Sequence, residues 1–210
     1  MHQTYSYASL SYSASNSSNY YPHILAFKSI IQFILFVSIV IVYTGNGKGK
    51  TTAALGMALR AVAYNYKVCM IQFIKGSWKY GEMKSYERLK PEFEMVIAGK
   101  GFVGIIDDDK PIDEHKLAAM NALKISREKV SSGNYDIVIL DEINYAIKLG
   151  LIEEDDVISM INNRAKNTSI VLTGNYASTK LIEIADLVTE MKEIKHPYKK
   201  GIKAIKGIDY

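Results

Sequence analysis

The residues best suited to chemistry form one glycine-rich run that follows an apolar segment. The run contains Gly45, Asn46, Gly47, Lys48, Gly49, Lys50, Thr51 and Thr52. Glycines let backbone N–H groups converge on a phosphate, because no Cβ stands in the way. A helix that begins near Gly49 would add the positive end of its dipole. Lys50 would then supply a mobile charge and the Thr51 hydroxyl a ligand for Mg²⁺, so the run predicts a nucleotide-phosphate loop.

The loop is one residue shorter than the usual phosphate-binding pattern. That pattern has four residues between its first glycine and the glycine before the lysine. Here Gly45 and Gly49 are separated by three residues, and Thr44 stands where the first glycine should be. We therefore expect the loop to hold a polyphosphate differently from ordinary kinases and ATPases. Phosphoryl transfer to an acceptor does not follow automatically from such a loop.

Two carboxylates, Asp141 and Glu142, follow the apolar run at residues 137–140. At the end of a strand in a parallel sheet, they would lie near the phosphate loop and hold Mg²⁺ directly or through water. One of them could instead cap the helix that follows. The joint occurrence of loop and acidic strand end favours the metal role for the pair.

The elements that must position these residues alternate along the chain. Strands are predicted at residues 39–43, 68–74, 93–98, 137–140 and 169–173, and helices at 50–64 and about 113–130. The strand segments are continuously apolar, which indicates burial on both faces and hence parallel pairing. The predicted fold is α/β, three layers around a mostly parallel sheet, P-loop NTPase-like (RecA-like). Ligands are expected at the carboxyl ends of its strands.

Composition narrows the function classes further. The chain of 210 residues is 48% apolar, with a net charge of +4, which suits one globular domain with an anionic small-molecule ligand better than a nucleic-acid binder. Its single cysteine, Cys69, lies in an apolar run and predicts a core residue. Because one cysteine permits no internal disulfide, a reducing compartment and a cytoplasmic location are the default expectation.

The first 37 residues differ from the rest. Residues 1–21 are rich in Ser, Tyr and Asn, a composition typical of disorder. The apolar run after them is interrupted by Lys28 and Gln32, so it is too short for a membrane span, which needs about 20 residues. We interpret residues 1–37 as a disordered or added N-terminal extension, or the product of a start codon set too far upstream, and residues 38–210 as the P-loop domain.

Five ordered blocks resemble the P-loop ATP:corrinoid adenosyltransferases. The segment 43–54 resembles their shortened phosphate loop, and four further segments are similar in order: 72–82, 138–142, 172–191 and 195–210. The resemblance covers about residues 39–210. It implies that a reduced cobalt(I) corrinoid attacks the 5′ carbon of ATP and expels triphosphate, with ATP held in the reverse direction to ordinary P-loop enzymes.

The resemblance also implies roles for particular residues. Residues 45–52 would bind ATP, with Lys50 and Glu142 as catalytic residues. Thr51 and Glu142 would coordinate Mg²⁺, with Asp141 in support. Phe102 would help to expel the lower axial ligand of the corrinoid. Because cobalt(I) carries no proton, no general base is required, and His115 and His196 receive no catalytic role.

The family's implied partners are an electron-donating reductase or flavoprotein and a second copy of the chain in a homodimer. Two positions depart from the family pattern: Gly104 replaces its usual tryptophan and Asn175 its usual arginine. The lysine-rich segment after residue 191 would form either a solvated surface or a tail folded over the triphosphate, and the resemblance favours the tail.

Two other function classes remain open from the sequence. A recombinase-like motor ATPase would share the loop and the acidic strand end, although the short loop and the absence of a basic stripe argue against it. A nucleotide-dependent binding or regulatory module, attached to a membrane through residues 24–37, would show no turnover.

Overall fold

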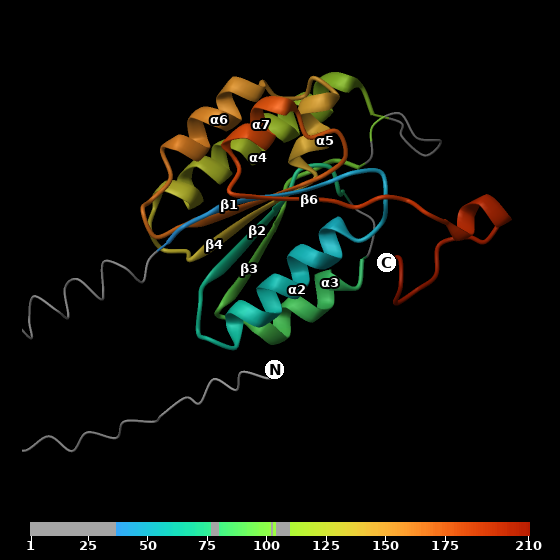
Figure 1. Ribbon diagram of the computed structural model, residues 1–210, viewed down its shortest axis with the longest axis horizontal. Helices are drawn as coiled ribbons and strands as arrows, with labels where there is room; N and C mark the ends of the chain where they lie inside the picture. The colour runs from blue at the N-terminus through green and yellow to red at the C-terminus, as the bar shows by residue number, and fades with distance from the viewer. Residues whose placement is uncertain (1–36, 77–79, 102, 104–109) are drawn as a thin grey trace, which may run out of the picture. The chain divides into compact units, whose positions relative to one another are not determined.

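A parallel six-stranded sheet forms the centre of the protein, with the strand order β3-β2-β4-β5-β1-β6 (Figure 1). The computed structural model describes residues 37–76, 80–101, 103 and 110–210. The strands are β1 (Val40–Thr44), β2 (Val68–Gln72), β3 (Phe93–Ile97), β4 (Ile137–Asp141), β5 (Ser169–Thr173) and β6 (Leu187–Glu190). The segment 1–36, most of the predicted N-terminal extension, lies outside the described residues.

Helices cover both faces of this sheet. On one face lie α2 (Lys50–Val62) and α3 (Glu82–Ser85), and on the other lie α4 (Ile112–Ser131), α5 (Ile143–Lys148), α6 (Glu154–Asn162) and α7 (Thr179–Ile184) (Figure 1). Two short 3₁₀ helices, η1 (Tyr86–Leu89) and η2 (Pro197–Lys200), complete the described elements. This arrangement confirms the predicted three-layer α/β architecture.

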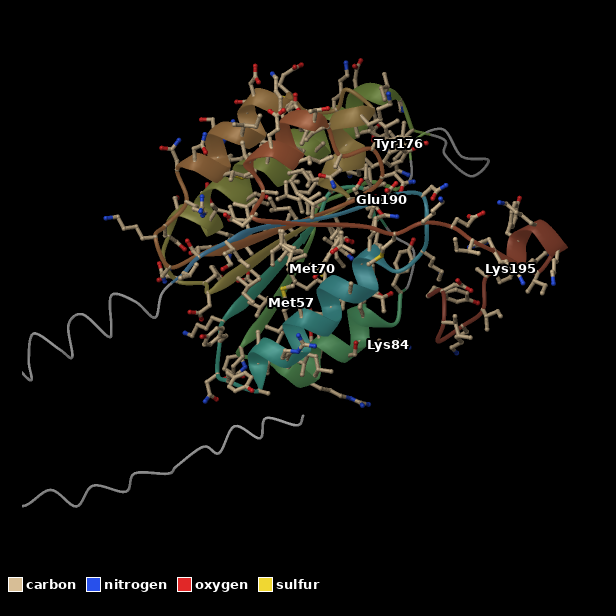
Figure 2. The ribbon with its side chains drawn as sticks, viewed as in Figure 1. Met57, Met70, Lys84, Tyr176, Glu190 and Lys195 are labelled. Carbon is tan, nitrogen blue, oxygen red and sulfur yellow. The ribbon has the colours of Figure 1, made fainter. Side chains whose placement is uncertain are left out.

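Successive strand residues feed two separate cores. On β2, Cys69 and Ile71 pack on the α4 to α7 side, whereas Val68 and Met70 pack against α2. Strand side chains alternate between the faces of a sheet, so a strand buried on both sides reads as a continuous apolar run. Figure 2 shows Met70 of β2 and Met57 of α2 in the layer between sheet and helix.

The predicted strands and helices differ from the observed ones mainly at their ends. The helix predicted at 50–64 ends at Val62, and the one predicted at 113–130 runs from Ile112 to Ser131. The sequence did not predict β6, because its four residues are all exposed at the sheet edge and lack the buried apolar pattern of the other strands. None of the described helices combines the length and apolarity that a membrane span needs.

Candidate nucleotide-binding site

The glycine-rich loop connects β1 to α2 at the carboxyl edge of the sheet. Gly49 caps α2 with a φ of 114°, a left-handed conformation that favours glycine. Its carbonyl accepts a hydrogen bond from Ala53 N at 2.7 Å, which closes the first turn of the helix. The N-terminus of α2 therefore faces the loop, and this is the arrangement that binds anions through free N–H groups and the helix dipole.

The loop lies directly against the chain that follows β6. A Cβ at Gly45 would lie 2.5 Å from the carbonyl oxygen of Met191, and one at Gly47 would lie 2.6 Å from it. The N–H of Gly47 donates to the same carbonyl at 2.6 Å, and Asn46 Oδ1 accepts from Glu193 N at 3.0 Å. Figure 2 shows Glu190, which ends β6, at this edge. Gly45 and Gly47 are thus required because any larger side chain at either position would collide with the backbone of Met191.

Lys50 spans the inside of the loop. Its Nζ donates to the carbonyls of Gly45 at 2.7 Å and Gly47 at 2.8 Å. Burial lowers the pKa of Lys50, and the nearby carboxylates of Glu142 and Asp141 oppose that shift. The ammonium is therefore held at the centre of the loop beside two acidic groups.

Asp141 is fully buried at the end of β4 and collects several donors. Its Oδ1 accepts from the hydroxyls of Thr51 and Thr173, each at 2.8 Å, and its Oδ2 accepts from Gln72 Nε2 at 3.2 Å. The single hydroxyl hydrogen of Thr51 is used in this bond, so the lone pairs of its oxygen remain available to a ligand. The structure thus joins the loop to the acidic strand end, as the sequence predicted.

Glu142 is the N-cap of α5 and has a left-handed conformation, with a φ of 63°. Its N–H donates to Thr173 Oγ1 at 2.9 Å, and its side chain lines the cavity. Burial, followed by the negative charge of Asp141, raises the pKa of Glu142 to about 7, although Lys50 and Lys75 act against the shift. A cation in the cavity would favour the ionised carboxylate.

The donor set fits Mg²⁺. A threonine hydroxyl and one or two carboxylates, together with substrate phosphates, are its usual ligands in nucleotide sites. Thr51 and Glu142 both line the cavity, and Asp141 orients Thr51. No three His, Cys, Asp or Glu side chains within the described residues gather into a metal site of their own.

A cavity of about 860 Å³ lies beside the loop. One wall is formed by residues 48–52 and Leu55, and a second by residues after β2, namely Lys75, Tyr80–Glu82 and Ser85. The third wall is the C-terminal segment, residues 204 and 207–210. Of the predicted site residues, Lys48, Gly49, Lys50, Thr51, Thr52 and Glu142 line the cavity, whereas Gly45, Asn46, Gly47 and Asp141 are not part of its lining.

The C-terminal segment does reach the cavity, but through different residues from those expected. Asp209 forms an ion pair with Lys48, and the described lysines after residue 191 do not line the cavity. The charge of those lysines favoured them in the sequence, whereas Asp209 carried no signal for a role. The buried His115 and the more exposed His196 also lie outside the cavity lining.

Sequence reasoning also missed Lys75, Tyr80 and Glu82 as part of the site. Their signal was their position shortly after a predicted buried strand, where ligands bind in such sheets. Phe102 and Gly104, which concern the corrinoid, lie outside the described residues. Asn175 follows β5, and its Oδ1 is buried without a hydrogen-bond partner among the described residues.

Comparison with known protein families and sequences shows which family this chain resembles. The model of the family described as ATP:corrinoid adenosyltransferase BtuR/CobO/CobP matches residues 37–210. A corrinoid adenosyltransferase of Escherichia coli strain K12 is 35% identical over 172 residues, which cover 82% of this chain and 85% of the relative. One from Pseudomonas aeruginosa is 38% identical over 172 residues, covering 82% and 83%.

Among solved structures, the flagellar accessory protein FlaH from Methanocaldococcus jannaschii has a TM-score of 0.50 at 17% identity. The match covers 73% of this chain and 70% of FlaH. At this identity the likeness concerns the fold alone, and it agrees with the α/β class that the parallel six-stranded sheet and its helices show.

Proposed function

Because the chain belongs to the ATP:corrinoid adenosyltransferase family BtuR/CobO/CobP, we propose that it transfers the 5′-deoxyadenosyl group of ATP to the cobalt(I) of a corrinoid. Triphosphate is the second product. The observation that carries the proposal is the family match over residues 37–210, the same span that holds the short loop and the cavity.

The reaction is a displacement at carbon. The electron pair of cobalt(I) forms a bond to C5′ of the ribose, the bond between C5′ and the phosphate oxygen breaks, and its electron pair leaves with the triphosphate. No proton moves in this step, so the site needs no general base. What it needs is stabilisation of the charge that develops on the leaving group.

Residues at the loop supply that stabilisation in our proposal. Lys50 turns its ammonium toward the phosphates, and the N-terminus of α2 adds its dipole. Thr51 and Glu142 hold Mg²⁺, while Asp141 orients the Thr51 hydroxyl. When bound, Mg²⁺ acts as a Lewis acid on the phosphate oxygens and lowers the energy of the departing triphosphate.

The remaining assignments stay predictions from the family resemblance. The corrinoid would bind near Phe102, at the end of the segment that follows β3. A reductase or flavoprotein would supply cobalt(I), a second copy of the chain would form a homodimer, and the protein would act in the cytoplasm.

Product analysis tests the function directly. The protein is incubated with Mg²⁺, ATP and a chemically reduced corrinoid, and the nucleotide and corrinoid products are separated. We expect a light-sensitive adenosylated corrinoid and triphosphate in equal amounts. Release of ADP and orthophosphate would sink the proposal in favour of a motor ATPase, and no turnover at all would favour a regulatory module.

The variant Lys50→Ala should reduce adenosylation to background, because the leaving group loses its central cation. A matched control is Lys180→Met, since Lys180 lies on α7, outside the cavity lining, in an exposed ion pair with Asp155. This control should retain the wild-type rate.

A further inference from the structure

Lys75 is a buried cation on the cavity wall that faces the phosphate loop. It lies just after β2 and is 7% exposed. Its Nζ is 2.9 Å from Glu82 Oε1, 3.4 Å from Asp141 Oδ2 and 4.7 Å from the centre of the Tyr80 ring. The transfer reaction described above gives Lys75 no role.

Lys75 and Lys50 differ in the groups that surround their ammonium nitrogens. Lys50 Nζ has two carbonyl partners in the loop, whereas Lys75 is paired with two carboxylates. Its charge is therefore already compensated within the protein, which makes it a poor phosphate ligand. Burial alone would lower the pKa of Lys75, but Asp141 and Glu82 together raise it, so the residue remains a cation.

Asp141 connects Lys75 to the loop. One carboxylate oxygen, Oδ2, faces Lys75 and Gln72, and the other, Oδ1, accepts the Thr51 hydroxyl. Asp141 has no exposed surface, and a buried carboxylate deprived of its cation becomes strongly unfavourable. Lys75 thus fixes both the charge and the orientation of the group that aims Thr51.

The backbone holds Lys75 rigidly in place. Gly101 N donates to Ile74 O at 2.9 Å, and Gly99 N donates to Gln72 O at 3.0 Å. A Cβ at Gly76 would lie 2.5 Å from Lys100 C, and one at Gly99 would lie 2.4 Å from Ile74 C. The segments after β2 and β3 are therefore joined backbone to backbone, so the Lys75 side chain starts from a fixed point.

We propose that Lys75 is a positioning residue for the binding of the Mg²⁺–nucleotide complex. It holds the Asp141 carboxylate, which in turn orients the Thr51 hydroxyl, and it ties Glu82 to the same wall of the cavity. This inference rests on the proposed function only in its premise that the cavity takes ATP with Mg²⁺.

The test compares ATP binding with and without the metal. Calorimetry measures the affinity of the full-length protein for ATP in excess Mg²⁺ and again in excess EDTA, and the ratio of the two affinities reports the metal's contribution. In Lys75→Met this ratio should fall about tenfold, as expected when a residue behind a metal ligand is lost. Affinity in EDTA should change little, because Lys75 does not contact the phosphates.

Further variants keep the test decisive. Lys75→Arg should restore most of the ratio, since it keeps the charge, and Lys180→Met should leave it unchanged. If Lys75→Met does not fold by circular dichroism, Glu82→Gln takes its place. It removes one of the two carboxylate partners of Lys75 and leaves Asp141 paired, so the ratio should fall less than in Lys75→Met, about threefold against the roughly tenfold expected when the residue itself is lost.

Two results overturn the inference: an unchanged ratio, or an equal loss of affinity with and without Mg²⁺, which would make Lys75 a direct phosphate ligand. Failure of the proposed function looks different. There, the wild-type protein either fails to bind ATP with Mg²⁺, or binds it and forms no adenosylated corrinoid. In the second case, the ratio of ATP affinities with and without Mg²⁺ in the Lys75 variants still tests the inference.

Discussion

The Thr51 hydroxyl donates to Asp141 Oδ1 at 2.8 Å, and this bond joins residues that are 90 positions apart in the sequence. Thr51 belongs to the first turn of α2 and Asp141 ends β4. The same Oδ1 also accepts the hydroxyl of Thr173 from β5. One buried carboxylate oxygen therefore sets the geometry between three elements of the site.

Asp141→Asn keeps the shape of the side chain but removes its charge. Lys75 loses one carboxylate partner, and the amide offers only one oxygen for Thr51, Thr173 and Gln72. We expect adenosylation to fall about 10- to 100-fold and the free energy of unfolding to fall by about 1–3 kcal/mol. Steady-state kinetics and urea unfolding measure the two effects. The control is Asp155→Asn, an exposed acid on α6; equal effects in both variants would contradict the special role of Asp141.

Gly47→Ala tests the close approach between the loop and the chain after β6. The new methyl would lie 2.6 Å from Met191 O, so one backbone must move, at a cost of about 1–3 kcal/mol in unfolding free energy. ATP affinity should fall as well. Gly56→Ala is the matched control, because a Cβ there meets nothing within 4 Å. Since Gly56 lies inside α2, that change should stabilise the protein by about 0.5–1 kcal/mol. A stable Gly47→Ala protein with normal ATP affinity would refute the contact.

Glu142 predicts a pH dependence of stability in the metal-free protein. Its pKa is raised from the ordinary 4.5 to about 7 in the folded state, so between these values the folded protein holds a proton that the unfolded chain releases. This contribution to stability is complete below pH 4.5 and is lost as the pH rises through 7, a decline of about 3 kcal/mol. Urea unfolding in EDTA from pH 4 to 8 should show the decline in the wild type and its loss in Glu142→Gln. Parallel curves for the two proteins would disprove it.

Cys69 should resist thiol reagents in the folded protein. It is fully buried, and burial raises the pKa of its thiol to about 12, so the reactive thiolate is rare. Iodoacetamide followed by mass spectrometry should detect no modification under native conditions and one modified cysteine in urea. Rapid labelling of the folded protein would show that the core on this side of the sheet opens readily.

Asp209→Asn tests the C-terminal wall of the cavity. The change removes the ion pair with Lys48, which joins the C-terminal wall of the cavity to the loop, so ATP should dissociate faster. The increase should be small, about two- to fivefold, because the Lys48 side chain is 44% exposed and exposed ion pairs contribute little. Stopped-flow displacement of a fluorescent ATP analogue measures the rate. Glu193→Gln is the control, because Glu193 pairs with Lys199 and does not line the cavity. High salt should bring the wild-type rate toward that of the variant; a salt-independent difference would contradict this origin.

The sequence predicted the elements whose burial leaves a periodic signal. β1, β2, β4 and β5 are buried on both faces and read as continuous apolar runs, and α2 carries its buried Ala54, Ala58 and Ala61 at helical spacing. The exposed β6 and the six-residue helices α5 and α7 are too short for such a pattern. Their positions depend on packing against the finished sheet. The nine-residue helix α6 was also not predicted, although its buried Val157, Met160 and Ile161 have helical spacing.

The residues of the candidate site also fall into those that the sequence predicted and those that it did not. The loop and the acidic strand end were predictable because each is a contiguous motif beside a strand. Lys75 and Asp209 were not, because each acquires its partner only when the chain folds: Lys75 meets Asp141 from the neighbouring strand, and Asp209 meets Lys48 across 161 positions. Residues that pair over such distances form no short motif that a single sequence would reveal.

The bond from Gly47 N to Met191 O gives the phosphate loop a dependence that its own eight residues do not reveal. If residues 45–52 were grafted into another protein, their side chains would be transferred but the shape of the loop backbone would not. That shape depends on packing against the segment directly after β6. Conversely, substitutions at positions 190–193 should change the affinity for the nucleotide while the sequence of the loop stays the same. A change in how the loop holds phosphates therefore requires mutations in the segment after β6 as well as in the loop.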